Sequence, residues 1–295
     1  MNWPDKTPSA AAHSPQLTAD SPFITRPPAD VAGWVAALDG REIPVLAATD
    51  ETLDELRAIE DAVDAHLLAD TMVVDPLMTL KLLRHVAALR RHRDQSDPET
   101  AIEALVMLGI TPFFRAFQAQ AVIETTLAGH PVALAGVQRV MQRSHRAAQF
   151  ALGFAVQRQD YDAPLIHEAT LLHDFAELLL WAHAPGLAQG LARRQRDQPA
   201  QRSADLQREL LNITLAELQQ ALMKAWRLPA LLVQIADDQG SERAQVRNVQ
   251  LAIRFARHSA LGWDNPALPD DVDEIADLLN LGKQPTLQLL RRLND

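Results

Sequence analysis

The stretch Leu171-Leu172-His173-Asp174-Phe175-Ala176-Glu177-Leu178 places a His-Asp pair inside a strongly apolar run. Imidazole and carboxylate groups both bind divalent metals such as Zn, Fe or Mn. A catalytic metal, however, usually needs three or more protein ligands and an open position for water. Whether further ligands exist therefore decides between an enzyme and a scaffold. The apolar residues from Leu165 to Ala182 predict one continuous helix that carries His173 and Asp174.

Composition indicates an all-α protein. The chain has 295 residues, 47% of them hydrophobic, with only 11 Gly and 1 Tyr. Helix-forming residues dominate, and the length is ample for a hydrophobic core. The formal net charge of −10 argues against general nucleic-acid binding, which needs a concentrated basic surface. With no cysteine, disulfides and thiolate metal sites are excluded, which is typical of the reducing cytoplasm.

Neither a membrane span nor a secretory signal is expected. No apolar run reaches the roughly 18 residues that a bilayer-spanning helix needs. The N-terminus does not begin with basic residues followed by an apolar core, so it does not resemble a signal peptide. We therefore expect a cytoplasmic protein that does not bind membranes.

Local signals place several helices. Residues 1–28, rich in Pro, Ala, Ser and Thr, lack apolar periodicity and predict a flexible tail. A short helix is expected at 29–38. Asp75-Pro76 opens a strong helix, because proline at the first helical position has no N–H to leave unpaired. Thr100 and Glu103 have the spacing of a reciprocal capping box, and Pro131 begins a long helix through about residue 157.

Three further segments have helical spacing. We expect one helix beginning at Thr49-Asp50 and running to residue 67, one over 110–128, and one over 272–293. The aromatic residues of the second segment, Phe113, Phe114 and Phe117, are interpreted as core. Glycine-rich phosphate loops and the GxSxG pattern of a serine nucleophile do not occur in the sequence.

Five fragments in this order resemble the HDOD family (HD-related output domain), a bacterial signalling relative of the HD phosphohydrolases. The fragments are Ile43-Pro44-Val45-Leu46, Asp75-Pro76 with Leu80-Lys81-Leu82-Leu83-Arg84, Thr100 with Ala104-Leu105 and Leu108-Gly109, Leu171-Leu172-His173-Asp174, and Trp226 with Leu228-Pro229. The resemblance implies an all-helical fold in which an N-terminal bundle packs on a degenerate HD-like bundle. It also implies a regulatory module without enzymatic activity.

On this basis the chain divides into four parts. Residues 1–28 are the tail, and 29–130 form the N-terminal helical subdomain of the HDOD module. Residues 131–240 form the HD-like helical subdomain. Residues 241–295 are a C-terminal helical extension packed on the HD-like part.

The sequence departs from the family pattern where metal ligands are expected. Arg143-Ser144 stands where relatives carry a His-Ser pair, so Arg143 occupies the place of the first metal-binding histidine of an HD enzyme. His145 lies two residues on, about 200° around the helix, and cannot simply substitute. Other histidine positions of the family are occupied by Leu215 and by Ala236-Asp237-Asp238.

Two interpretations of the His-Asp pair follow. Either His173 and Asp174 bind a divalent ion with help from His145, His167 or Glu177, or they are vestigial metal ligands that make structural hydrogen bonds. In the second case Arg143 pairs with Asp174, and a guanidinium replaces the lost ion without supplying a Lewis acid. We favour the second interpretation and predict no catalytic residues and no cofactor.

The expected function is that of a non-catalytic bacterial signalling protein that contacts other signalling proteins. One alternative is a metal-dependent phosphohydrolase. Another is a module that binds a nucleotide second messenger through Arg143 or the basic run Arg90-Arg91-His92-Arg93.

Overall fold

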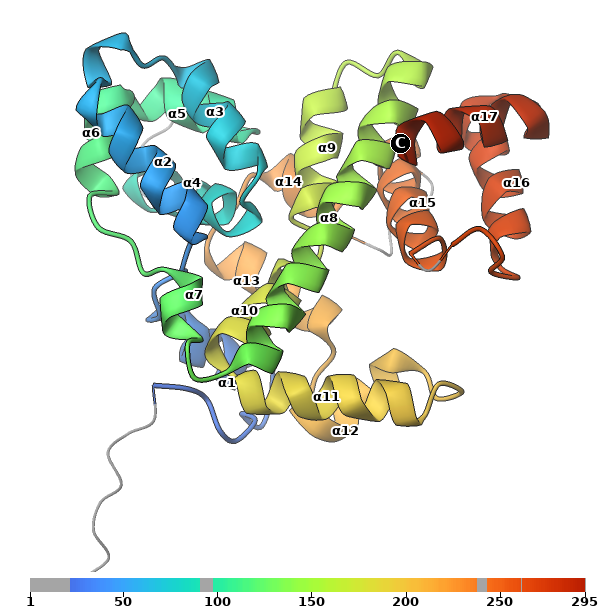
Figure 1. Ribbon diagram of the computed structural model, residues 1–295, viewed down its shortest axis with the longest axis horizontal. Helices are drawn as coiled ribbons and strands as arrows, with labels where there is room; N and C mark the ends of the chain where they lie inside the picture. Colours follow the sequence, from blue (N-terminus) through green and yellow to red (C-terminus); the bar gives the residue numbers. More distant parts are fainter. Residues whose placement is uncertain (1–21, 91–97, 238–242, 261, 295) are drawn as a thin grey trace, which may run out of the picture.

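The computed structural model describes residues 22–90, 98–237, 243–260 and 262–294. Throughout these residues the regular elements are helices, joined by short links (Figure 1). The one β-type contact recorded among them is an isolated parallel bridge between Val45 and Val122. The predicted all-α class is therefore confirmed.

The N-terminal bundle consists of five helices grouped at one end of the molecule (Figure 1). They are α2 (Ala47–Ala58), α3 (Ala65–Val73), α4 (Pro76–Leu89), α5 (Ala101–Leu108) and α6 (Ile110–Ala116). Helix α4 begins at Asp75-Pro76 as predicted, and Asp75 caps it, since one carboxylate oxygen accepts from the backbone N–H of Leu77 at 2.9 Å and of Met78 at 3.2 Å.

Two helices in this half are shorter than the sequence predicts. The helix expected from Thr49 to residue 67 begins at Ala47 and is interrupted after Ala58 by a 3-10 turn, Glu60–Ala62. Asp64 then caps α3 by accepting from the N–H of Leu67 at 2.9 Å. The helix expected over 110–128 ends at Ala116, and a link leads to α7 (Ile123–Thr126). Capping and the bridge to Val45 outweigh the apolar periodicity in these segments.

Helix α8 (Pro131–Arg158) runs through the middle of the molecule and supports the HD-like half (Figure 1). Helices α9 (Ala163–Leu171), α10 (Phe175–His183) and α15 (Ala244–His258) pack against it. Helices α8 and α10 approach each other closely at Gly136, because a Cβ at this position would lie 2.6 Å from the Trp181 ring of α10. The predicted start and length of this helix are confirmed.

Helices α9 and α10 replace the single helix predicted from Leu165 to Ala182. The chain turns at Leu172-His173-Asp174, where the N–H of Phe175 bonds back to the carbonyl of Leu172 at 3.1 Å. Histidine and aspartate are weak helix formers. The turn directs the Asp174 carboxylate towards partners on α8 and α15, and these long-range contacts are invisible to local periodicity.

The beginning of the described chain packs against the HD-like half. The N–H of Ile24 donates to the carbonyl of His183 at 2.7 Å, so residues 22–28, which we assigned to the tail, make tertiary contacts. Residues 1–21 lie outside the described part. Helix α1 (Val31–Asp39) packs on α13 (Leu215–Ala225), although we assigned it to the N-terminal subdomain. Buried Trp34 donates its indole N–H to the carbonyl of Leu211 at 2.8 Å.

The remaining helices complete the HD-like half and the C-terminal extension. They are α11 (Pro185–Asp197), α12 (Ser203–Leu211), α14 (Ala230–Ile235), α16 (Leu268–Leu279) and α17 (Lys283–Asn294). The helix expected over 272–293 is split by Asn280, which adopts a left-handed conformation at φ 52°. Helix α17 returns to α8, where Leu293 fills the space above Gly153. None of the helices in the described ranges is long and apolar enough to cross a bilayer.

Candidate functional site

The predicted pair between Arg143 and Asp174 is present. Arg143, in the middle of α8, reaches the turn before α10, and its Nη2 lies 2.6 Å from Asp174 Oδ2. Its Nε donates to the same oxygen at 2.8 Å. Nη2 also lies 2.7 Å from Oε2 of Glu177, one turn into α10. A single guanidinium therefore bridges the two carboxylates nearest the His-Asp turn.

The second oxygen of Asp174 is also engaged. Oδ1 lies 3.1 Å from Nδ1 of His173 and 3.0 Å from Nη2 of Arg257, which belongs to α15. Burial alone would raise the pKa of Asp174, but Arg257 and Arg143 together hold it well below its ordinary value. Burial by itself would lower the pKa of Arg143, and the two carboxylates raise it instead. Asp174 is therefore an anion with two cationic partners.

The other metal ligands that the sequence offered lie elsewhere or are already bonded. His145 turns to the N-terminal bundle, with Nε2 3.0 Å from the carbonyl oxygen of Val74. His167 is close enough to His145 for the two imidazoles to influence each other, and burial lowers the pKa of both. Glu177 does lie beside Asp174, but Arg143 is between them.

These donors do not fit a divalent ion. Within the described ranges, no group of three His, Asp or Glu side chains has the arrangement that a metal needs. Both oxygens of Asp174 point at guanidinium groups, whose positive charge repels a cation. We therefore derive no catalytic step through a metal at this turn.

The sequence of this chain matches a known protein family. The family model described as "HDOD domain" matches residues 43–241, which is more than half of the chain. This chain belongs to the HDOD family. The fragments that suggested the resemblance, from Ile43 to Leu228-Pro229, all lie within the matched residues.

Solved structures share the HDOD fold over most of their length. The MmoQ response regulator of Methylococcus capsulatus str. Bath is 21% identical, with a TM-score of 0.64, covering 85% of this chain and 98% of that one. A virulence factor of Campylobacter jejuni subsp. jejuni is 15% identical, with a TM-score of 0.67, covering 90% and 96%. At these identities the likeness concerns the fold. No curated protein matches the chain.

The two halves of the HDOD module meet at Arg84 and Trp226, which both belong to the family fragments found in the sequence. The guanidinium of Arg84 on α4 lies over the ring of Trp226, just after α13, with its Cζ 4.5 Å from the ring centroid. Trp226 donates its indole N–H to Oδ1 of Asp39 at 2.9 Å, and Arg84 forms an ion pair with the same oxygen at 3.5 Å. Cation–π and charge-assisted contacts therefore join α1, α4 and α13.

A buried glutamate makes a second contact between the halves, which sequence reasoning missed. Glu168 on α9 accepts the N–H of Ala101, at the start of α5, at 2.8 Å. The reciprocal capping box predicted there is only half present, because Thr100 accepts from Glu103 while the carboxylate of Glu103 accepts from the N–H of Glu99. Burial raises the pKa of Glu168 to about 7.

Arg257 was missed for a different reason. It lies 83 residues after Asp174 and outside the matched HDOD segment, in a helix with several arginines. Nothing in the sequence distinguishes it from its neighbours.

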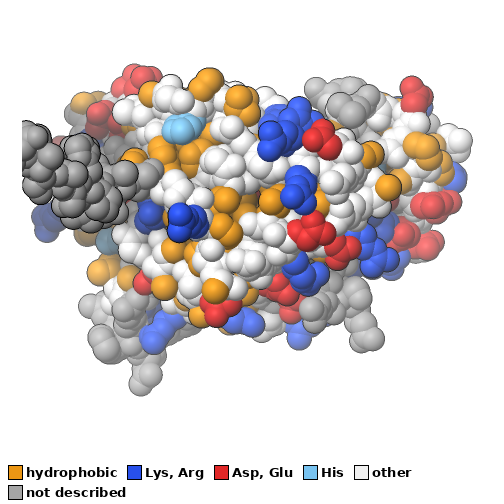
Figure 2. Space-filling view, turned by 90° about the horizontal axis from the view of Figure 1, so that it is seen from below, with side chains coloured by type: hydrophobic (Ala, Val, Ile, Leu, Met, Phe, Trp, Pro, Cys, Tyr) orange, Lys and Arg blue, Asp and Glu red, His pale blue; other side chains and the backbone are white. Residues whose placement is uncertain are grey.

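On the face shown in Figure 2, basic and acidic side chains lie beside one another rather than forming one continuous basic surface.

Of the basic run Arg90-Arg91-His92-Arg93, which the sequence offered for anion binding, the structure describes only Arg90. Arg91, His92 and Arg93 lie outside the described residues. Arg90 is buried at the end of α4 and contacts the sulfur of Met107 on α5. Of the predicted core aromatics, Phe113, Phe114 and Phe117 are all buried, which confirms that interpretation.

Proposed function

We propose that this HDOD protein is a non-catalytic regulatory protein that acts through contacts with other signalling proteins. The observation that carries the proposal is the position of Arg143, whose Nη2 lies 2.6 Å from Asp174 and 2.7 Å from Glu177. The positive charge of the guanidinium stabilises both negatively charged carboxylates. The guanidinium offers no open coordination position and cannot activate a water molecule as a divalent metal does.

The phosphohydrolase alternative requires extra ligands around His173. His145 is the nearest histidine in sequence to Arg143, yet its Nε2 donates to the carbonyl oxygen of Val74 on the side of the N-terminal bundle. Catalysis would therefore need a rearrangement that removes two guanidinium groups from Asp174 and brings in at least one distant histidine. This requirement favours the regulatory proposal.

The alternative of a nucleotide second messenger meets a similar difficulty at Arg143. A phosphate would have to displace two carboxylates that already contact the guanidinium, one of them on a largely buried residue. Calorimetric titration with cyclic dinucleotides and guanosine polyphosphates tests this alternative. Heat that disappears in Arg143→Gln would favour it over a purely protein-binding role.

The decisive experiment measures metal content and turnover together. Protein purified without chelators is analysed for transition metals and assayed with phosphodiester and phosphomonoester substrates, with and without added Mn²⁺, Fe²⁺ or Zn²⁺. We expect neither a stoichiometric ion nor turnover. A stoichiometric ion that supports hydrolysis, with both lost in His173→Ala, would overturn the proposal.

A gain-of-binding variant tests the replacement of metal by guanidinium directly. The double variant Arg143→His/Arg257→Gln places an imidazole near Asp174 and removes both cations. It is expected to take up a divalent ion, measured by titration with Co²⁺ and its visible absorption. The matched control is Arg143→Gln/Arg257→Gln, which removes the same charges without adding a ligand. Equal Co²⁺ binding by wild type and both variants would contradict the reasoning.

The partner itself can be sought from the native cell. One structural neighbour is named a response regulator, and this name supports a signalling role only by analogy of fold. Capture with the intact chain, followed by mass spectrometry, should recover signalling proteins. Recovery should be unchanged in His173→Ala, because the proposal gives this residue no chemistry.

A further inference from the structure

Helices α2 and α3, with the 3-10 turn Glu60–Ala62 between them, belong to the end of the molecule opposite to α16 and α17 (Figure 1). Residues 50–70 of these elements hold eight carboxylates and one arginine, and therefore contribute −7 to the formal net charge of −10. The other 274 residues together contribute only −3. The negative charge of this protein is thus concentrated in one short segment of the N-terminal bundle.

Most of these carboxylates have no partner inside the protein. Asp54 pairs with Arg57, Glu60 accepts from the hydroxyl of Thr111, and Asp64 caps α3. The other five make no hydrogen bond or ion pair with any described residue. Four of these five are exposed, namely Glu51, Glu55, Asp61 and Asp70. Like charges crowded in this way repel one another, so a binding partner that neutralises them is favoured.

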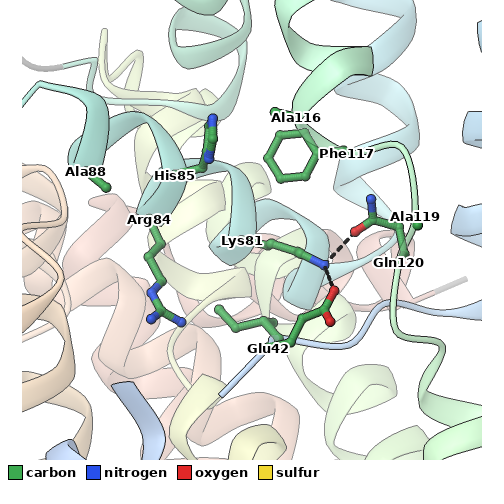
Figure 3. A pocket seen from close by; sticks show the side chains of 10 residues that line it. Glu42, Lys81, Arg84, His85, Ala88, Ala116, Phe117, Ala119 and Gln120 are labelled. Atoms are coloured by element: carbon green, nitrogen blue, oxygen red, sulfur yellow. Dashed lines mark hydrogen bonds and ion pairs between the residues drawn. The ribbon is translucent and has the colours of Figure 1, made fainter. Parts of the chain in front are cut away.

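Cations of the bundle do not balance this charge. Arg57 is turned inwards, and its Nη2 donates to the carbonyl of Phe117 at 2.9 Å. Lys81 on α4 is held by Glu42 at 2.9 Å, beside a separate pocket of about 320 Å³ (Figure 3). Arg115 on α6 is exposed, but a single cation cannot balance five unpaired carboxylates. Compensation must therefore come from solvent ions or from a partner.

Two large apolar side chains lie within the acidic segment. Ile59, at the end of α2, is 54% exposed, and Leu67, in the first turn of α3, is 41% exposed. They flank the 3-10 turn that carries Glu60 and Asp61. Exposed apolar side chains rimmed by charges are typical of a protein-binding surface, in which the apolar centre loses its water and the charged rim selects the partner.

The spacing of the carboxylates on α2 fits a helical partner. Glu51 and Glu55 are four residues apart, and exposed Ile59 is one further turn along the same helix face. Neighbours at this spacing lie about 5–6 Å apart, as basic side chains at i and i+4 on a second helix do. The phosphates of nucleic acids and the head groups of anionic lipids are negative, and this surface repels them. A basic helix with an apolar stripe complements both the charge and the spacing.

We propose that the outer face of α2, the 3-10 turn and α3 docks a basic amphipathic helix of another protein. Basic side chains of that helix pair with Glu51, Glu55 and Asp61. Its apolar stripe covers Ile59 and Leu67. The inference rests on the proposed function, because it gives a regulatory module that acts through protein contacts a docking surface and a partner of stated chemistry.

The test uses the full chain and a labelled lysine–leucine peptide, with leucines at i, i+3, i+4 and i+7, in fluorescence anisotropy titrations. The peptide should bind wild type, and less tightly as NaCl is added, because salt screens exposed charges. Glu51→Lys/Glu55→Lys should weaken binding about tenfold or more, since two attractive pairs become repulsive. Asp264→Lys/Asp277→Lys reverses two exposed carboxylates in the C-terminal extension. This matched control should bind as wild type does, and circular dichroism checks that both variants are folded.

The apolar part of the surface is tested without any change of charge. Ile59→Gln/Leu67→Gln should weaken binding of the same peptide several-fold. A second peptide of identical composition, with its leucines spread evenly around the helix, should bind wild type less tightly than the amphipathic peptide. Equal binding of the two peptides would show that the surface attracts positive charge alone, and would overturn the docking of an amphipathic helix.

The remaining outcomes separate this inference from the proposed function. The docking surface is wrong if the peptide does not bind, or if both charge-reversal variants bind it equally. Self-association of wild type in sedimentation runs, abolished by Glu51→Lys/Glu55→Lys, would assign the face to a second copy of the chain instead. None of these results bears on the metal and turnover measurements at His173. Conversely, a catalytic metal there would remove the non-catalytic proposal and leave peptide binding intact.

Discussion

Replacing Arg143 by methionine should destabilise the protein through the carboxylates that it leaves behind. The Asp174 side chain is only 11% exposed, and that of Arg143 only 25%, so water cannot readily take the place of the guanidinium. Breaking a buried ion pair by removing one partner costs about 3–5 kcal/mol. Arg257 remains 3.0 Å from Asp174 and offsets part of the loss. We therefore expect the free energy of unfolding to fall by about 2–4 kcal/mol.

Urea denaturation followed by circular dichroism measures this change. For a chain of this size, with a denaturant slope of roughly 3 kcal/mol per M, the midpoint should fall by about 1 M. Arg143→Lys keeps the charge but loses the two-pronged contact, and should lie between wild type and Arg143→Met. Arg139→Met, one turn earlier on α8 and exposed, is the control and should change the midpoint little.

The pH dependence of this difference follows from the pKa of Asp174. That pKa is lower in the folded protein than the ordinary value of 3.8, so the stabilisation is fully present above pH 3.8 and is lost as the pH falls through the folded value. The gap between wild type and Arg143→Met should thus persist from pH 8 to pH 5 and narrow below about pH 4. A loss no larger than that of Arg139→Met at pH 7 would refute the reasoning.

Two further changes test the packing and the junction. The pKa of Glu168 is raised from 4.5 to about 7, so its ionisation lowers the free energy of unfolding as the pH rises from 5 to 8. Glu168→Gln should remove this loss, which is on the order of 3 kcal/mol. Urea titrations of wild type and variant at pH 5 and pH 8 measure it. If the free energy of unfolding changed equally with pH in wild type and Glu168→Gln, this prediction would be wrong. Gly136→Ala should lower the melting temperature, because its Cβ meets Trp181 at 2.6 Å and overpacking costs about 1–3 kcal/mol. Gly190→Ala on α11 has open space around the new methyl group and should raise the melting temperature or leave it unchanged.

Local signals in the sequence predicted much of the helical framework. Asp75-Pro76 marked the start of α4 correctly, because an aspartate cap and a proline at the first helical position act within one turn. Pro131 and the apolar spacing after it gave α8 within one residue of its observed end. Apolar periodicity failed where a cap or a tertiary contact interrupts a helix, as after Ala58 and at Leu172.

The sequence by itself determined the fold class and the family fragments, and it predicted that Arg143 stands where relatives carry a metal-binding histidine. These properties depend on composition, on spacing within a few residues and on residue identity. The tertiary structure alone decided that the chain turns at His173-Asp174, that Arg257 joins Arg143 at Asp174, and that Glu168 meets the start of α5. Such contacts join residues 31 to 83 positions apart, and their energies depend on burial and charge that exist only once the helices have packed.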